Sequence, residues 1–260
     1  MHPMLNIAIR AVRQAGSIIT KYYEIADSTE LKQKGNYDLT NFVEKKAKDQ
    51  MIDIIFKSYP NHIIFTENDS QIYKDTQKVQ WVINALDDNI NYMKRLPHFS
   101  ISIATRVKGR TEVAVVYDPM RNELFYAWRG HGTQLNGYRL RGGTARYLSE
   151  AILSTDAIFK VHESNAPSIN AFEKLFCRCA DFRRSGSVAL DLAYVASGRI
   201  DGYFAINLQP HDFAAGDLLV REAGGLVTDF SGDNHYFCSG NLVAGNARIV
   251  QSILAQIRQR

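Results

Sequence analysis

The chain has 260 residues, of which 45% are hydrophobic and 22% are charged; this composition is typical of a globular protein and excludes a disordered chain. No apolar run reaches the roughly 18 residues of a membrane-spanning helix, and the N-terminus lacks a signal-peptide layout, so the sequence predicts a cytoplasmic protein without a membrane anchor. The net charge of +4 is spread over scattered basic pairs, which indicates a solvated surface and disfavours a dedicated RNA-binding protein.

The first half of the sequence begins with helices and continues as strands. Apolar residues at three- and four-residue spacing predict an amphipathic helix over 4–23 and a second helix over 42–58, ended by Pro60. Gly and Pro residues separate the segments that follow, which predicts an antiparallel meander. The strand-like segments of this half are 62–65, 79–83, 100–107, 111–117 and 123–128.

The second half alternates strand and helix, which predicts an α/β layer arrangement and, for the whole chain, a fold between α+β and α/β. Its predicted strands are 151–155, 200–205, 226–229 and 242–244. Its predicted helices are 165–179, 187–197, 213–223 and 247–258. No low-complexity linker separates the halves, so we expect an N-terminal part, 1–145, and a C-terminal part, 146–260, packed as one unit.

Acidic residues follow several of these apolar segments. Glu67 and Asp87 each come a few residues after a buried-type strand, and Asp212 precedes a predicted helix. Ligands in layered α/β folds gather at the carboxyl ends of strands, and Mg²⁺ prefers hard oxygen ligands of this kind. Two such ions could activate a water and neutralise a leaving oxygen. From spacing alone, however, surface acids or helix caps are the more common explanation.

Three motifs carry a resemblance to a known family. The segment 80–92, Q-W-V-I-N-A-L-D-D-N-I-N-Y, resembles the inositol monophosphatase signature W-x-I-D-P-L-D-G-T-x-N-[FY]. Residues 65–68 are similar to the T-E-E element of that family, and 210–216 to its W-D-x-A-A-G element. Long runs, including M-H-P-M-L-N-I-A, K-R-L-P-H-F and G-R-T-E-V-A-V-V-Y-D-P-M-R-N-E-L-F, resemble the bacterial SuhB branch of the family.

The resemblance implies a layered αβαβα sandwich, a homodimer and a Mg²⁺ site. The metal positions that it implies are Glu67, Asn84, the carbonyl of Leu86, Asp87 and Asp212. The implied catalytic positions are Glu67, Asn89 and Glu44. The implied substrate-binding positions are Asp87, Asp88, Ser187, Ala205 and Asp212.

The sequence departs from the family pattern at the centre of this site. Asn84 replaces an aspartate that bridges two ions, and each lost anion–cation contact is worth about 4 kcal/mol at an effective dielectric of about 20. Asp88 replaces a glycine that approaches the substrate phosphate, and a carboxylate there repels an anion. Asn89 replaces a threonine whose hydroxyl, with an acid on the second helix, positions the attacking water. The remaining departures are Ala85 for proline, Glu44 for aspartate, His211 for tryptophan and Ala205 for an acid.

Two functions therefore stay open. The first is an adaptor without catalysis, since the SuhB branch acts with Nus factors and RNA polymerase in ribosomal RNA antitermination. The second is a weak or altered Mg²⁺-dependent inositol-1-monophosphatase, acting on inositol phosphate or a related sugar phosphate. In that case Glu67, Asp87 and Asp212 hold one ion loosely. A less favoured alternative is that Asp88 replaces the lost acid at position 84, because its backbone offset directs the side chain elsewhere. Whether the chain is an enzyme is not decided by the sequence.

Overall fold

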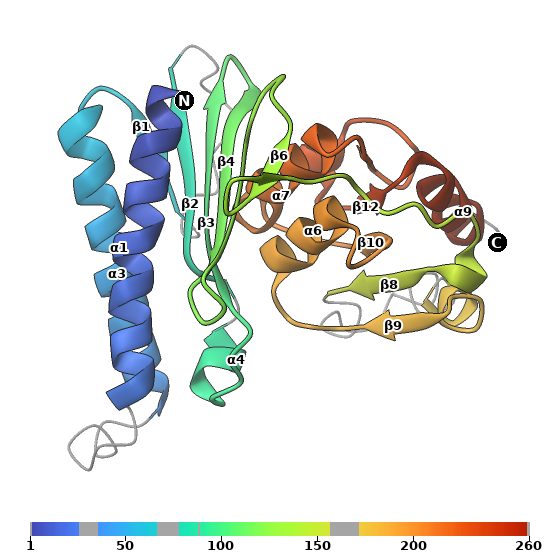
Figure 1. Ribbon diagram of the computed structural model, residues 1–260, viewed down its shortest axis with the longest axis horizontal. Helices are drawn as coiled ribbons and strands as arrows, with labels where there is room; N and C mark the ends of the chain where they lie inside the picture. Colours follow the sequence, from blue (N-terminus) through green and yellow to red (C-terminus); the bar gives the residue numbers. More distant parts are fainter. Residues whose placement is uncertain (1, 26–35, 67–77, 88, 157–171, 259–260) are drawn as a thin grey trace.

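Five layers of helix and sheet make up the molecule (Figure 1). The computed structural model describes residues 2–25, 36–66, 78–87, 89–156 and 172–258. One outer layer holds α1 (Pro3–Ile25) and α3 (Asn36–Ser58), and the central layer holds α6 (Val188–Ser197) and α7 (Pro210–Glu222). The opposite outer layer is α9 (Ala247–Arg258). A sheet lies between each pair of helical layers, which is the expected αβαβα sandwich.

The first sheet is formed by the seven described strands of the N-terminal part, in chain order from β1 to β7. β1 and β2 are parallel, and every later neighbour pair is antiparallel, which confirms the predicted meander. The strands are β1 (Ile63–Phe65), β2 (Gln80–Asp87), β3 (Ser100–Val107), β4 (Arg110–Asp118), β5 (Glu123–Trp128), β6 (Thr133–Leu135) and β7 (Tyr138–Arg139).

The second sheet is mixed and follows the order β11-β12-β10-β8-β9 in the described residues. Its strands are β8 (Ile152–Thr155), β9 (Asp181–Arg183), β10 (Gly202–Ala205), β11 (Leu226–Thr228) and β12 (Leu242–Gly245). Short helical segments join the layers, and they are α4 (Asn89–Met93), the 3₁₀ turn η1 (Leu148–Glu150) and α8 (Tyr236–Ser239).

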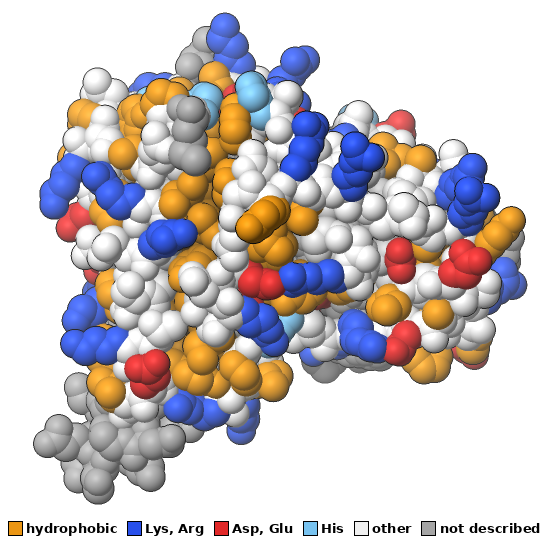
Figure 2. All heavy atoms as spheres, in the orientation of Figure 1, with side chains coloured by type: hydrophobic (Ala, Val, Ile, Leu, Met, Phe, Trp, Pro, Cys, Tyr) orange, Lys and Arg blue, Asp and Glu red, His pale blue; other side chains and the backbone are white. Residues whose placement is uncertain are grey.

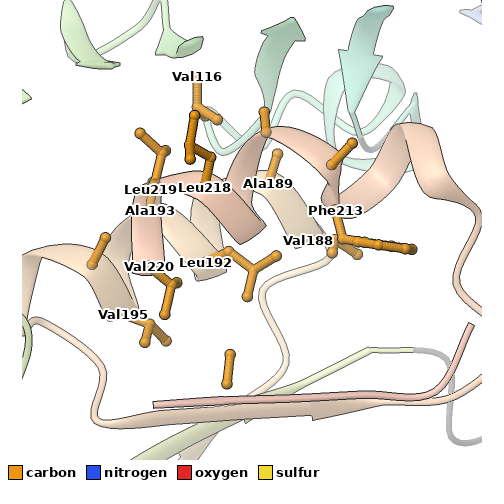
Figure 3. Packing of buried hydrophobic residues seen from close by; sticks show 14 of the residues in the cluster. Val116, Val188, Ala189, Leu192, Ala193, Val195, Phe213, Leu218, Leu219 and Val220 are labelled. Atoms are coloured by element: carbon orange, nitrogen blue, oxygen red, sulfur yellow. The ribbon is translucent and has the colours of Figure 1, made fainter. Parts of the chain in front are cut away.

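A separate hydrophobic cluster fills each interface between layers. α1 and α3 cover one face of the first sheet, and α9 covers the outer face of the second sheet. The central cluster joins both sheets through α6 and α7, and Figure 3 shows Leu218 and Leu219 of α7 next to Val116 of β4. Burial of apolar side chains on both faces explains why α6 is hydrophobic nearly all round and why residues 213–220 of α7 are buried throughout.

Most predicted elements are present, with differences at their ends. α3 begins at Asn36, six residues before the predicted start at 42, because its first turns carry polar residues that hide the helical period. The predicted helix over 165–179 lies largely outside the described residues. β6, β7 and β9 were not predicted, since each has only two or three residues. The division at residues 145 and 146 stays a prediction.

The surface agrees with the scattered charge of the sequence. Lys and Arg side chains are spread over the face in Figure 2, with Asp, Glu and apolar side chains between them. None of the helices in the described ranges combines the length and the apolar character that a membrane span requires.

Candidate functional site

A β-bulge near the end of β2 sets the direction of the site residues. Residues Trp81, Ile83, Ala85 and Leu86 all pack in the cluster beneath α1 and α3, so the alternation of the strand breaks between Ala85 and Leu86. The pairing with β3 shifts register over the same residues, between Asn84 and Asp87. The extra residue turns Asp87 to the opposite face of the sheet, toward α6.

Asp87 is buried, with 5% of its surface exposed, and meets the first turn of α6. Its Oδ2 accepts hydrogen bonds from the Ser187 hydroxyl at 2.6 Å and from the Ala189 backbone N–H at 3.0 Å. The Ser100 hydroxyl lies 3.5 Å from the same oxygen. A carboxylate at a helix N-terminus is stabilised by the unpaired N–H groups and the helix dipole, so Asp87 acts as a cap on α6.

Asp212 lies in the first turn of α7 and caps that helix. Its Oδ2 accepts from the Gln209 backbone N–H at 2.8 Å, which forms one half of a capping box. Its Oδ1 lies 3.2 Å from Nε2 of His211. Both carboxylate oxygens therefore contact groups of the α7 terminus.

Asn89 and Glu44 contact one another directly. The Asn89 side-chain amide donates from Nδ2 to Oε2 of Glu44 at 2.9 Å and so joins α4 to α3. An amide N–H group can donate but cannot accept a proton. The pair therefore lacks the hydroxyl relay that would pass a proton from a water to the carboxylate.

A cavity of about 540 Å³ lies where the end of β2 meets the starts of α6 and α7. It brings together three of the predicted residues, Asp87, Asn89 and Asp212. Two exposed aliphatic side chains, Ile90 and Leu96, form part of its wall. This volume is within the range of small-molecule sites.

The other predicted site residues have different positions. Asn84 is 8% exposed on β2, and Ser187 is fully buried at the N-cap of α6. Ala205 is fully buried in the central cluster, where its methyl group offers no polar contact. Leu86 packs its side chain beneath α1 and α3, and a metal role for its carbonyl stays a prediction. Glu67 and Asp88 lie outside the described residues.

Several residues of the site were not predicted. Asn91 donates from Nδ2 to the carbonyls of His98 and Ser185, at 2.8 and 2.9 Å. Asp156 and Arg184 form an ion pair of 3.4 Å at the cavity wall. The sequence contained a signal for Asn91, which is part of the signature segment, but Asp156 follows β8 without any motif.

Asp191 is a second buried acid beside the site. Its two carboxylate oxygens accept from the hydroxyls of Ser154 and Ser185, at 2.6 and 2.7 Å. Burial raises the pKa of Asp191 to about 7, an effect that the two serine hydrogen bonds reduce and that nearby Asp156 strengthens. Ser185 also lines the large cavity, so Asp191 holds one wall of it.

The described residues fit a magnesium centre poorly. Such a centre needs several oxygen ligands turned toward the ion. Position 84 offers a neutral amide, and Asp87 and Asp212 each hold a backbone N–H of a helix terminus. Among the described residues, which do not include Glu67 or Asp88, no three His, Cys, Asp or Glu side chains are grouped as metal ligands.

Comparison with known proteins gives consistent matches over the whole chain. The inositol monophosphatase family profile matches residues 1–260. The chain is 60% identical to Nus factor SuhB of Escherichia coli K12 over 258 residues, which cover 99% of this chain and 97% of that protein. The extragenic suppressor protein suhB of Bartonella henselae has a similar structure, with a TM-score of 0.87, 30% identity and coverage of 99% and 100%. The inositol monophosphatase of Anabaena (Nostoc) sp. PCC 7120 has a TM-score of 0.84, 29% identity and coverage of 98% and 94%.

Proposed function

The chain belongs to the inositol monophosphatase family, and from this premise we propose that it is a SuhB-type transcription adaptor whose phosphatase chemistry is weak or lost. It acts in the cytoplasm as a homodimer, with Nus factors and RNA polymerase, in antitermination of ribosomal RNA synthesis. The observation that carries the proposal is its high identity, over nearly the full length, to relatives that are named Nus factors.

The chemistry of the cavity supports the loss of catalysis. Glu44 is bonded to an amide N–H of Asn89, which cannot relay a proton from water. Asn84 supplies a neutral oxygen at the position where the family has a bridging carboxylate. Asp87 and Asp212 each cap a helix. The contacts of Asp87 and Asn89 join neighbouring elements of the fold, and that of Asp212 holds the start of its own helix.

The surface supports a role in binding partners. The runs 94–99 and 110–125 match the SuhB branch closely, although the cavity next to the first run has changed. The first run exposes Lys94 and Pro97, and half of the Leu96 surface is accessible. In the proposed role a partner covers the exposed Leu96 side chain, and burial of this apolar surface contributes to binding.

A capture experiment tests the adaptor proposal. The purified chain is immobilised and offered a purified Nus factor and RNA polymerase, separately and together. We expect capture by the unmodified chain, and at least tenfold weaker capture by Leu96→Asp at unchanged thermal stability. Lys45→Glu, at an exposed position on α3, is the matched control and should bind normally. Absence of capture by the unmodified chain would contradict the proposal.

The cavity itself favours a second candidate, a Mg²⁺-dependent inositol-1-monophosphatase. Asp87, Asp212 and Arg184 still line a space large enough for a sugar phosphate. The reaction would transfer a phosphoryl group to water, giving the free alcohol and inorganic phosphate. Bound Mg²⁺ would supply the activated water, and Asp87 and Asp212 would hold the ion with carboxylate oxygens, while Oδ2 of each accepts a hydrogen bond from a backbone N–H group.

A further inference from the structure

The contacts of Asp87 cross from the N-terminal part of the chain to the C-terminal part. Its hydrogen bonds reach Ser187 and Ala189, which are 100 and 102 residues further along the chain. Asn91 makes a second crossing contact to the Ser185 carbonyl, 94 residues away. The two contacts start from the end of β2 and from α4, and both reach the segment that starts α6, so they form one short seam at the cavity.

The hydrogen-bond donors at this seam, the Ser187 hydroxyl and the Ala189 N–H, are directed at the Asp87 carboxylate. Ser187 is fully buried, and the N–H of Ala189 belongs to the first turn of α6, where no carbonyl of the helix is available to it. Removal of the Asp87 carboxylate would leave the Ala189 N–H buried without this acceptor, and the Ser187 hydroxyl with Oγ of Ser100, at 3.4 Å, in its place. Hydrogen bonds to a charged acceptor are also the stronger kind. The seam is therefore stabilised by the fold's own donors and requires no ion.

The second acidic position of the site, Asp212, also holds groups of a helix terminus, but its contacts are local. Asp212 is bound by the Gln209 N–H and by His211, both from the terminus of its own helix. Asn89 in turn bonds to Glu44 and joins α4 to α3. Asp87 and Asn89 therefore join different structural elements, whereas Asp212 caps its own helix.

We propose that Asp87 and Asn91, with Ser185, Ser187 and Ala189, form a metal-independent clasp that fixes the two parts of the chain against each other. Asp87 is a positioning residue in this role. The clasp explains why an aspartate stays at position 87 although the neighbouring position 84 is an asparagine. By fixing the two parts, the clasp would let one partner bind surfaces on both parts at once. This use of the clasp rests on the proposed adaptor function, whereas the clasp itself does not.

Thermal unfolding with and without Mg²⁺ tests the clasp. Thermal unfolding is measured in EDTA and again at Mg²⁺ concentrations of about 1 and 10 mM. The proteins compared are the unmodified full chain and the variants Asp87→Asn, Ser187→Ala and Asp53→Asn. Asp53 is an exposed aspartate of α3 and serves as the control. We expect Asp87→Asn to lower Tm by about 5 °C or more, and Ser187→Ala by about half as much, in EDTA and in Mg²⁺ alike. The unmodified chain and Asp53→Asn should melt at one Tm in both conditions.

Hydrogen exchange locates the effect. The amides of Ala189 and Leu190 should exchange at least tenfold faster in Asp87→Asn, while the amides of α1 keep their rates. A Tm for Asp87→Asn equal to that of the control would overturn the clasp. A Tm of the unmodified chain that rises with Mg²⁺, with the rise absent in Asp87→Asn, would also overturn it and would assign Asp87 to a metal. Neither result depends on whether a Nus factor binds.

Discussion

Two buried aspartates lie at the first turn of α6, Asp87 of β2 against it and Asp191 within it, and their surroundings favour opposite charge states. Asp87 receives a backbone N–H and a hydroxyl at the helix N-terminus, where the helix dipole favours negative charge. Asp191 is 1% exposed, receives only the hydroxyls of Ser154 and Ser185, and has its pKa raised to about 7 by burial. The same side chain is therefore a charged cap at one place and a proton-binding group at the other.

This difference indicates which part of the site supports the fold. A carboxylate that holds helix N–H groups contributes stability in its ionised form, whereas a buried acid with a raised pKa lowers stability when it ionises. The two aspartates should therefore respond in opposite ways to neutralisation by asparagine. The following variants test this contrast in order of the expected size of their effects.

Asp191→Asn should remove a pH dependence of stability. The folded-state pKa of Asp191 is about 7 and the ordinary value is 3.8, so the unfolded chain loses this proton first as the pH rises. The contribution is fully present below pH 4 and is lost between pH 4 and pH 7, which amounts to about 4 kcal/mol. Urea unfolding at pH 4 and pH 8 measures it.

The asparagine variant should show a smaller fall in unfolding free energy over this range than the unmodified chain. At pH 8 it should be the more stable of the two, in contrast to Asp87→Asn. An identical fall in both proteins would show that Asp191 ionises normally and that the contrast between the two aspartates is wrong.

Gly216→Val should disturb the packing that places α6 for both aspartates. A Cβ atom at Gly216 of α7 would lie 2.4 Å from Cβ of Leu192 of α6, closer than two side-chain carbons can approach. The helices would have to move apart, at a cost of about 3 kcal/mol. Urea unfolding compares this variant with Gln14→Val, an exposed position on α1 that should change little. Equal stability of the two variants would show that α6 and α7 have room to separate.

Most helices and strands of the layered fold were predictable from the sequence, because the spacing of apolar residues indicates which face of an element is buried. α9 was predicted with its observed ends, since its apolar residues recur every three or four positions and polar residues fill the other face. α4 was missed because one turn of helix is too short to show a period. The start of α3 was missed because its polar first turns resemble a loop.

Asn89→Ala should have the smallest effect. It removes the hydrogen bond to Glu44, but Asn89 is exposed and water can replace the amide. We expect a change of about 0.5 kcal/mol or less in the unfolding free energy. A loss larger than that of Gly216→Val, measured in the same urea titration, would mean that the Glu44 contact supports the fold and not only the cavity wall.

The site was predictable in its positions but not in its contacts. Motifs identified Asp87, Asp212 and Asn89, and the fold brings these three to one cavity. Helix capping was an open alternative for strand-end acids, and the structure places both described aspartates at helix termini. The bulge at Ala85 and Leu86 could not be predicted, because the direction of Asp87 depends on a register shift between β2 and β3. Asp191 could not be identified either, since its raised pKa depends on burial by elements distant in sequence.

The central claim is that this fold is kept while its phosphatase chemistry has lapsed, and phosphate release from inositol monophosphate tests it most directly. The assay is run at millimolar Mg²⁺ on two proteins that are shown to be equally folded. One is the unmodified chain, and the other is a quadruple variant carrying Asn84→Asp, Ala85→Pro, Asp88→Gly and Asn89→Thr. We predict no phosphate release above the uncatalysed background for the unmodified chain, and measurable turnover for the quadruple variant. Ordinary turnover by the unmodified chain would contradict the claim.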